Sequence, residues 1–298
     1  MSAVAFSASP SSSRSRAWVS LLKLRLNFLV IVAALAGYLL AVPTGQPLNW
    51  AALAALTVGV LLSAGGASAI NMGLEAHLDA LMERTRMRPV PAGQISRDEA
   101  IIFGSVCTAL GVGTLFVALG PVPAALSAAT VLLYTAVYTP LKTRSNLNTI
   151  VGAIPGALPV LLGWTAAGVP MTAAALSLFT LIFVWQFPHF LAIATLHRED
   201  YARAGFKMLP VADPTGLATA HRVLLHALVY VPVSILPACL GLGGQVALWG
   251  GLGCALFFLG TALRAAFTRS LASWRFLFWA SLFVLPAQFA FLLVATAS

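Results

Sequence analysis

The sequence predicts an all-α polytopic membrane protein, a bundle of nine transmembrane helices with one polar face on the cytoplasmic side. Three observations predict this fold class. Of the 298 residues, 60% are hydrophobic and 8% are charged, whereas a soluble domain is usually about 25% charged. The chain divides into nine long apolar runs. Its 17 Lys and Arg and its 8 Asp and Glu are concentrated in the N-terminal segment and in alternate connectors.

Each apolar run approaches the length of roughly 20 residues that a helix needs to cross a hydrocarbon core. In chain order the candidate spans are Asn27–Val42, Ala51–Ile70, Ala100–Gly120, Pro123–Tyr138, Thr149–Gly168, Met171–Leu196, Val223–Leu242, Val246–Leu263 and Phe276–Thr296. The runs are continuously apolar rather than alternating, which favours helices over a β-barrel. Residues 1–19, which are rich in Ser, are predicted to be a disordered tail, and residues 20–298 a single transmembrane domain.

The basic residues predict the orientation, because short basic loops stay in the cytoplasm. All 17 lie in the N-terminal segment or after the second, fourth, sixth and eighth spans. Nine spans then place the N-terminus in the cytoplasm and the C-terminus outside, and the short tail favours a bacterial inner membrane over a mitochondrial one. The net charge of +9 is explained by this topology and by anionic lipids, so no nucleic-acid partner is expected. The three cysteines have no metal or redox spacing.

The acidic residues cluster in two connectors. Five of the eight lie between residues 75 and 99, and the other three follow the sixth span. Membrane topology asks little of Asp and Glu, so this clustering needs another explanation. Asn71, Glu75 and Asp79 repeat every four residues, which places three oxygen-bearing side chains on one face of a helix that extends the second span. Such a stripe suits Mg²⁺; a solvated helix end is the alternative.

Arginines follow this stripe at positions 84, 86, 88 and 97. Guanidinium groups bind phosphate oxygens bidentately, so they favour a phosphate-bearing ligand. After the fourth span, Tyr134, Tyr138 and Lys142 also fall four residues apart, although Pro140 bends or ends that helix. Ordinary interfacial aromatic residues with a snorkelling Lys are the alternative.

The sixth span carries polar residues at membrane depth. Gln186 and His189 are three residues apart and share a helix face, with Trp185 and Phe190 beside them and His197 eight residues further on. Polar side chains inside a membrane usually face a cavity or a neighbouring helix. A histidine that only bonds another helix is the alternative, but the aromatic neighbours and the second histidine favour a binding site.

Together these segments resemble the UbiA superfamily of intramembrane prenyltransferases, and within it the branch that acts on heme. The resemblance is carried by residues 71–89, 134–159, 185–190 and 198–210, in this order. One departure stands out. Glu75 takes the place where the family usually has Asp, and His77 the place where it often has another acid. Glutamate still binds Mg²⁺, but its longer arm would move the ion.

The resemblance implies transfer of a farnesyl group from farnesyl diphosphate to a vinyl group of heme B, with addition of water. It implies Mg²⁺ held by Asn71, Glu75, Asp79, Glu199 and Asp200, and a diphosphate bound by Arg84, Arg88, Lys142 and Arg144. Heme or the isoprenoid would contact Tyr134, Tyr138, Trp185, Gln186, Phe190 and His197. The expected catalytic residues are Asn71, Glu75, Asp79, Asp200 and His189. His189 would ligate the heme iron, hold a propionate or transfer a proton.

The implied partners besides the substrates are the lipid bilayer and a downstream heme-oxidising membrane enzyme. Three other functions fit part of the sequence. Another prenyltransferase of the superfamily would act on a quinone precursor or a chlorin. A transporter also has many spans, but carriers often bind near the midplane between repeats, whereas these acids lie at one face and no repeat is visible. A non-catalytic heme-binding membrane protein would explain His189 but not the acidic residues.

Overall fold

The computed structural model describes residues 10–297, with side chains for residues 14–294, and every regular element in that part is helical. This confirms the all-α prediction. In chain order the elements are α1 (Pro10–Leu21), α2 (Leu24–Ala41), α3 (Trp50–Leu74), α4 (Ala76–Asp79), α5 (Arg97–Leu119), α6 (Pro121–Leu132), the π-helical turn η1 (Leu133–Tyr138), α7 (Thr139–Leu141), α8 (Asn148–Ala166), α9 (Ala173–Leu196), α10 (Arg198–Arg203), α11 (Leu209–Ala212), α12 (Leu217–Cys239), α13 (Gly244–Thr268) and α14 (Leu271–Ala297).

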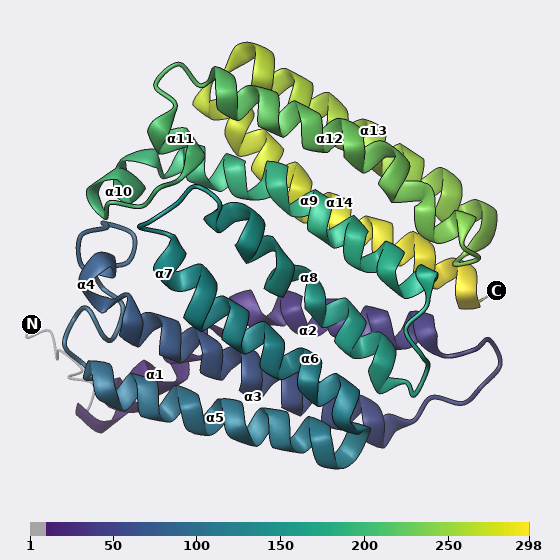
Figure 1. Ribbon diagram of the computed structural model, residues 1–298, viewed down its shortest axis with the longest axis horizontal. Coiled ribbons are helices and arrows are strands. Elements are labelled where there is room, and N and C mark those ends of the chain that lie inside the picture. Colours follow the sequence, from purple (N-terminus) through teal and green to yellow (C-terminus); the bar gives the residue numbers. More distant parts are fainter. Residues whose placement is uncertain (1–9, 298) are drawn as a thin grey trace, which may run out of the picture.

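Nine helical stretches among the described residues are long and apolar enough to cross a membrane. This confirms the predicted number, and the chain is a multi-pass membrane protein. The long helices run side by side, with α1 at the N-terminal end of the bundle and the last turn of α14 at the opposite end (Figure 1). The short helices α4, α7, α10 and α11 gather at the N-terminal end, which we call the polar end because it holds the charged connectors.

Several helices run further than the sequence predicted, and two of them take in arginines that were expected in connectors. α13 continues past Leu263 and so includes Arg264, while α14 begins at Leu271 and so includes Arg275. A long arginine side chain can lie along apolar surface and keep its charge at the boundary, so it need not end a membrane helix. The guanidinium of Arg264 accordingly lies 5.4 Å from the centre of the Phe276 ring.

The structure corrects the predicted disordered tail for residues 10–19. These residues form most of α1, and Ala17 and Leu21 are buried in a cluster that also contains Met72 of α3. Apolar packing therefore orders a segment whose composition is that of a flexible tail. Lys23 has a left-handed backbone conformation, with φ 44°, and this residue separates the helices α1 and α2. Residues 1–9 lie outside the described residues.

Two apolar clusters hold the long helices together. One joins α2, α3, α5, α6 and α8, and the larger joins α2 and α8 to α9, α12, α13 and α14. α8 is thus shared by both halves of the bundle. Gly163 of α8 allows a very close approach to α2, since a methyl group there would lie 1.7 Å from the backbone oxygen of Ala34. This packing fixes α8 and, through it, the neighbouring η1 and α9 that carry the site.

Candidate active site

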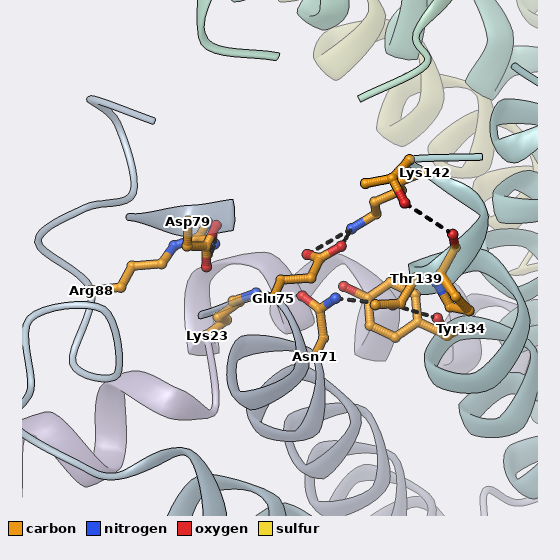
Figure 2. Close-up of polar contacts among 10 residues, drawn as sticks. Lys23, Asn71, Glu75, Asp79, Arg88, Tyr134, Thr139 and Lys142 are labelled. Carbon is orange, nitrogen blue, oxygen red and sulfur yellow. Dashed lines mark hydrogen bonds and ion pairs between the residues drawn. The ribbon is translucent and has the colours of Figure 1, made fainter. Parts of the chain in front are cut away.

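The predicted stripe lies at the polar end, and Figure 2 shows its three side chains on successive turns. We call Asn71, Glu75 and Asp79 the α3–α4 stripe. α3 ends at Leu74 and α4 restarts at Ala76, but backbone bonds of 2.9 Å from Glu75 to Asn71 and 2.8 Å from Asp79 to Glu75 keep the helical spacing across the break. All three side chains are buried. The alternative of a solvated helix end is therefore wrong.

Each carboxylate of the stripe faces a cation. Lys142 Nζ lies 2.8 Å from Oε1 and 2.9 Å from Oε2 of Glu75. One guanidinium nitrogen of Arg88 lies 3.0 Å and 2.8 Å from the two carboxylate oxygens of Asp79. Buried charges of this kind persist only when they are paired. These two ion pairs hold the carboxylates of the stripe in place.

Asn71 is held from two sides. Its amide nitrogen donates to the Thr139 hydroxyl at 3.0 Å, and its amide oxygen accepts a 3.4 Å bond from Lys23 Nζ. The Thr139 hydroxyl in turn donates to the backbone oxygen of Tyr134 at 2.8 Å. Two distant segments therefore orient the amide, and neither contact was predicted from the sequence.

The turn η1 explains how Thr139 reaches Asn71. The Tyr134 carbonyl accepts the Thr139 N–H five residues on, which is the π-helical pattern. The next residue is Pro140, which has no N–H to donate. A π-helical turn holds one more residue than an α-turn and changes the direction of the side chains after it, as is frequent at functional sites. In this way Thr139 and Lys142 both face the stripe (Figure 2).

Lys142 is enclosed by aromatic rings as well as by Glu75. Its Nζ lies 4.7 Å from the centre of the Tyr138 ring and 5.7 Å from that of Phe206. Burial alone lowers the pKa of Lys142, but the oxygens of Tyr138 and Glu75 outweigh it and hold the pKa above the ordinary value for lysine. The Lys142 side chain therefore stays a cation.

The stripe fits a single Mg²⁺ ion. Two carboxylates and an amide supply the hard oxygen donors that this ion prefers, with the remaining positions left for water and phosphate oxygens. Glu75 Oε1 is buried and receives no hydrogen bond, although the Lys142 ammonium lies close to it. An oxygen of this kind has a lone pair free for a cation.

The predicted second acidic pair does not join the stripe. Asp200 accepts a 3.1 Å bond from the backbone N–H of Glu83 and pairs with Arg203, while Glu199 is exposed. No group of three His, Cys, Asp or Glu close enough to hold a metal occurs among the described residues. Of the five predicted metal ligands, the structure thus brings only Asn71, Glu75 and Asp79 together.

Asp200 instead anchors the connector that follows α4. Burial alone raises its pKa, but hydrogen bonds from Arg203 and from the backbone of Glu83 and Arg84 outweigh it and hold the pKa of Asp200 below the ordinary value. Nearby His197 is half-buried, and desolvation together with the charge of Arg84 lowers its pKa. The second acidic segment therefore contacts the connector after α4, through the backbone of Glu83 and the charge of Arg84.

A cleft of about 640 Å³ opens beside the stripe, between α1 and the α4–α5 connector. None of the residues that line it is acidic. Its four basic lining residues are Arg16, Lys23, Arg84 and Arg88. Arg84 and Arg88 were predicted phosphate ligands, whereas Arg16 and Lys23 were assigned only to topology. Arg144 is exposed and is not one of the residues that line the cleft. The α1–α2 break has no sequence signal that could have predicted the placement of Lys23.

The predicted aromatic and polar residues fall into two groups. Tyr134 and Tyr138 stack with their ring centres 5.7 Å apart next to Lys142. Trp185, His189 and Phe190 lie deeper in α9, where His189 packs 4.8 Å from Trp185. Gln186 is fixed by a 3.1 Å bond to the backbone oxygen of Ala153 in α8. Gln186 thus connects α9 to α8.

Comparison with known proteins identifies relatives across most of the chain. The sequence pattern of the UbiA prenyltransferase family matches residues 30–293. A protoheme IX farnesyltransferase of Solibacter usitatus is 36% identical over 288 residues, which are 94% of this chain and 98% of the relative. A protoheme IX farnesyltransferase of Sorangium cellulosum is 41% identical over 258 residues, which are 85% of this chain and 89% of the relative.

Solved structures with low sequence identity share the fold. A digeranylgeranylglyceryl phosphate synthase superimposes with a TM-score of 0.79 at 14% identity, over 96% of this chain and 99% of its own. A UbiA homolog from Archaeoglobus fulgidus, bound to GPP and Mg²⁺, gives a TM-score of 0.64 at 15% identity, over 93% and 99% of the two chains.

Proposed function

The chain belongs to the UbiA prenyltransferase family, and we propose that its reaction is the transfer of a farnesyl group from farnesyl diphosphate to a vinyl group of heme B. The chain is an enzyme, and its relatives over most of its length are protoheme IX farnesyltransferases. The observation that carries the proposal is the buried stripe facing Lys142 beside a cleft of cations. A diphosphate on an apolar substrate needs such a site at a membrane boundary.

The reaction balances with water as the third reactant. The bond between farnesyl C1 and the diphosphate oxygen breaks, and C1 bonds to the outer carbon of the vinyl group. The inner vinyl carbon then takes the oxygen of water, whose proton is released. Heme B gains a farnesyl group and a hydroxyl group, and the products are a hydroxyethylfarnesyl heme, diphosphate and a proton.

The residues at the polar end stabilise the diphosphate as it leaves. Mg²⁺, when bound, neutralises charge that develops on the leaving group. We assign Asn71, Glu75 and Asp79 as its protein ligands. Lys142 and Arg88 bind the diphosphate oxygens directly, Lys142 as a point charge and Arg88 as a planar fork. Arg84 adds positive charge from the cleft, which Lys23 also lines. A preorganised set of cations costs little reorganisation when the bond breaks.

The residues next to Lys142 suit the allylic cation. The stacked rings of Tyr134 and Tyr138 present π faces to a positive charge, which stabilises it without a covalent bond. The farnesyl chain extends from there between helices into an apolar interior, where its burial is favourable. Heme B lies deeper, towards His189. We place the polar end in the cytoplasm of a bacterium, in its inner membrane, because the basic connectors lie at that end.

The direct test uses purified protein with heme B, farnesyl diphosphate and Mg²⁺, followed by mass analysis of the porphyrin. We expect a gain of one farnesyl and one hydroxyl group, and loss of product when EDTA removes the metal. Farnesylation of a quinone precursor instead of heme would establish the other prenyltransferase function. Absence of diphosphate release with any acceptor would leave only a non-catalytic role.

Asp79→Asn tests the metal assignment. The substitution removes a buried negative oxygen from the stripe, so we expect kcat to fall by about 10²-fold or more, while the protein still inserts and elutes as a folded species. Asp98→Asn is the matched control, since Asp98 is exposed at the start of α5, and it should keep full activity. Near-normal turnover of Asp79→Asn at saturating Mg²⁺ would refute the assignment.

A further inference from the structure

The deeper aromatic group contains a histidine whose ring is held by neighbouring aromatic rings and one hydroxyl group. His189 lies in α9 between two rings, with ring centres 4.8 Å from Trp185 and 5.4 Å from Phe278 of α14. His189 Nδ1 is 2.7 Å from the hydroxyl oxygen of Ser281, also in α14. We call Trp185, His189, Phe278 and Ser281 the His189 cluster.

The hydrogen bonds of Ser281 assign the protonation of this ring. A serine hydroxyl has one hydrogen to donate, and we assign that of Ser281 to the backbone oxygen of Phe278, which lies 2.5 Å from the hydroxyl oxygen. The hydroxyl oxygen must therefore accept a hydrogen from His189 Nδ1. A neutral imidazole has one N–H, so Nε2 carries a lone pair.

The remaining contacts of the His189 cluster set the direction of the Nε2 lone pair. The indole N–H of Trp185 donates to the backbone oxygen of Ser281 at 3.0 Å, so one residue of α14 fixes both rings of α9. His189 Nε2 has no hydrogen-bond partner among the described residues. It is also not one of the enclosed polar atoms without a partner, so it keeps some accessible surface.

Building on the proposed function, we propose that Ser281 is a positioning residue that holds His189 in the Nδ1–H form and directs Nε2 to the iron of the heme substrate. A ligating histidine usually donates its other N–H to a fixed acceptor, which sets the orientation of the ring. Binding at the iron would hold the porphyrin in one place relative to the farnesyl cation.

The other two roles considered for His189 fit this geometry less well. An unprotonated Nε2 cannot donate a hydrogen bond to a propionate. A proton acceptor would become a buried imidazolium, which needs a nearby negative charge. Among the described residues, the ring contacts are aromatic side chains and one hydroxyl that is already used.

The test measures ferric heme bound to purified full-length protein in detergent. We expect His189→Ala to abolish the absorption and electron paramagnetic resonance signature of histidine ligation. We expect Ser281→Ala to weaken heme affinity about tenfold or more and to change that signature. Ser234→Ala is the matched control, because Ser234 is equally buried and makes the same bond to the backbone oxygen three residues earlier, 2.7 Å to Val231.

Binding of farnesyl diphosphate reports whether each variant is folded, because that site lies at the polar end. If Ser281→Ala does not fold, the isosteric pair Ser281→Thr and Ser281→Val decides, since only Thr keeps the hydroxyl. A spectrum and heme affinity unchanged in Ser281→Ala, or equal in the Thr and Val variants, overturns the inference. Wild-type protein that makes no farnesylated heme refutes the proposed function instead.

Discussion

Lys142 and Glu75 illustrate how a pair of residues takes its chemistry from its surroundings. Each would be an ordinary surface charge at a helix end. In the folded chain they form an ion pair with 11% and 6% of their side-chain surfaces exposed, close to the Tyr138 ring. The interaction of two charges strengthens as water is excluded. The pair is therefore a structural contact, and its cation is one that we propose binds phosphate.

Substitution of Lys142 separates these two roles. Lys142→Met leaves the Glu75 carboxylate buried without its cation, so we expect a loss of about 3–5 kcal/mol of stability together with loss of turnover. The double variant Lys142→Met with Glu75→Gln removes the uncompensated charge. It should recover much of the thermal stability in detergent but none of the activity. Recovery of activity in the double variant would contradict the role of Lys142 in binding diphosphate.

Asp200 gives the protein a pH-dependent contribution to stability. Its pKa is lower in the folded state than in the unfolded state, so the carboxylate stabilises the fold above the unfolded value of about 3.9. That contribution is lost as the pH falls through the folded pKa. We expect Asp200→Asn to lower Tm at pH 7 and to flatten its decline below about pH 4. A parallel decline in both proteins would show that other groups control acid unfolding.

At the element scale, the contact between α2 and α8 depends on glycine. A methyl group at Gly163 would meet the Ala34 backbone oxygen at 1.7 Å, so Gly163→Ala must force the helices apart. Such overpacking typically costs about 1–3 kcal/mol. We expect a lower Tm and lower activity, since α8 supports η1.

Gly113 provides the control for this substitution. It also lies within a membrane helix, α5, but a methyl group there would meet nothing within 4 Å. Gly113→Ala should leave activity unchanged and raise Tm slightly, because alanine favours a helix by about 0.5–1 kcal/mol over glycine. Equal losses of Tm in the two variants would point to a general effect of replacing glycine rather than to the α2–α8 contact.

The short elements decide more of the site than the long ones. η1 turns Thr139 and Lys142 towards the stripe, and α1 brings Arg16 to the cleft. Neither element follows from hydropathy. A π-helical turn is one extra residue in a helix, and its presence depends on the bonds that Thr139 finds in the folded chain.

At the scale of the whole molecule, the arrangement separates two environments. The charged connectors lie at one end of the bundle, and the long apolar helices extend from there to the opposite end (Figure 1). A substrate with an anionic head and an apolar body suits this arrangement, because the head binds at the boundary and the body enters from the lipid. Attraction between the basic end and anionic lipids further fixes its depth.

The orientation of the whole chain can be checked with reporters. α1 and the last turn of α14 lie at opposite ends of the bundle, and the basic end should face the cytoplasm. Alkaline phosphatase, which is active only outside the cytoplasm, should be active when fused to the C-terminus. The same enzyme inserted at Gly93, in the connector between α4 and α5, should be inactive. Activity at Gly93 would reverse the proposed orientation.

The sequence by itself determined the membrane location, the nine spans and the stripe of Asn71, Glu75 and Asp79. These features are local, because apolar length and a four-residue spacing can be found along a single segment. The folded chain decided which partners those residues receive. Lys142 meets Glu75 across 67 residues, and Ser281 meets His189 across 92. No spacing along the chain encodes such pairs, because they depend on how the helices pack against one another.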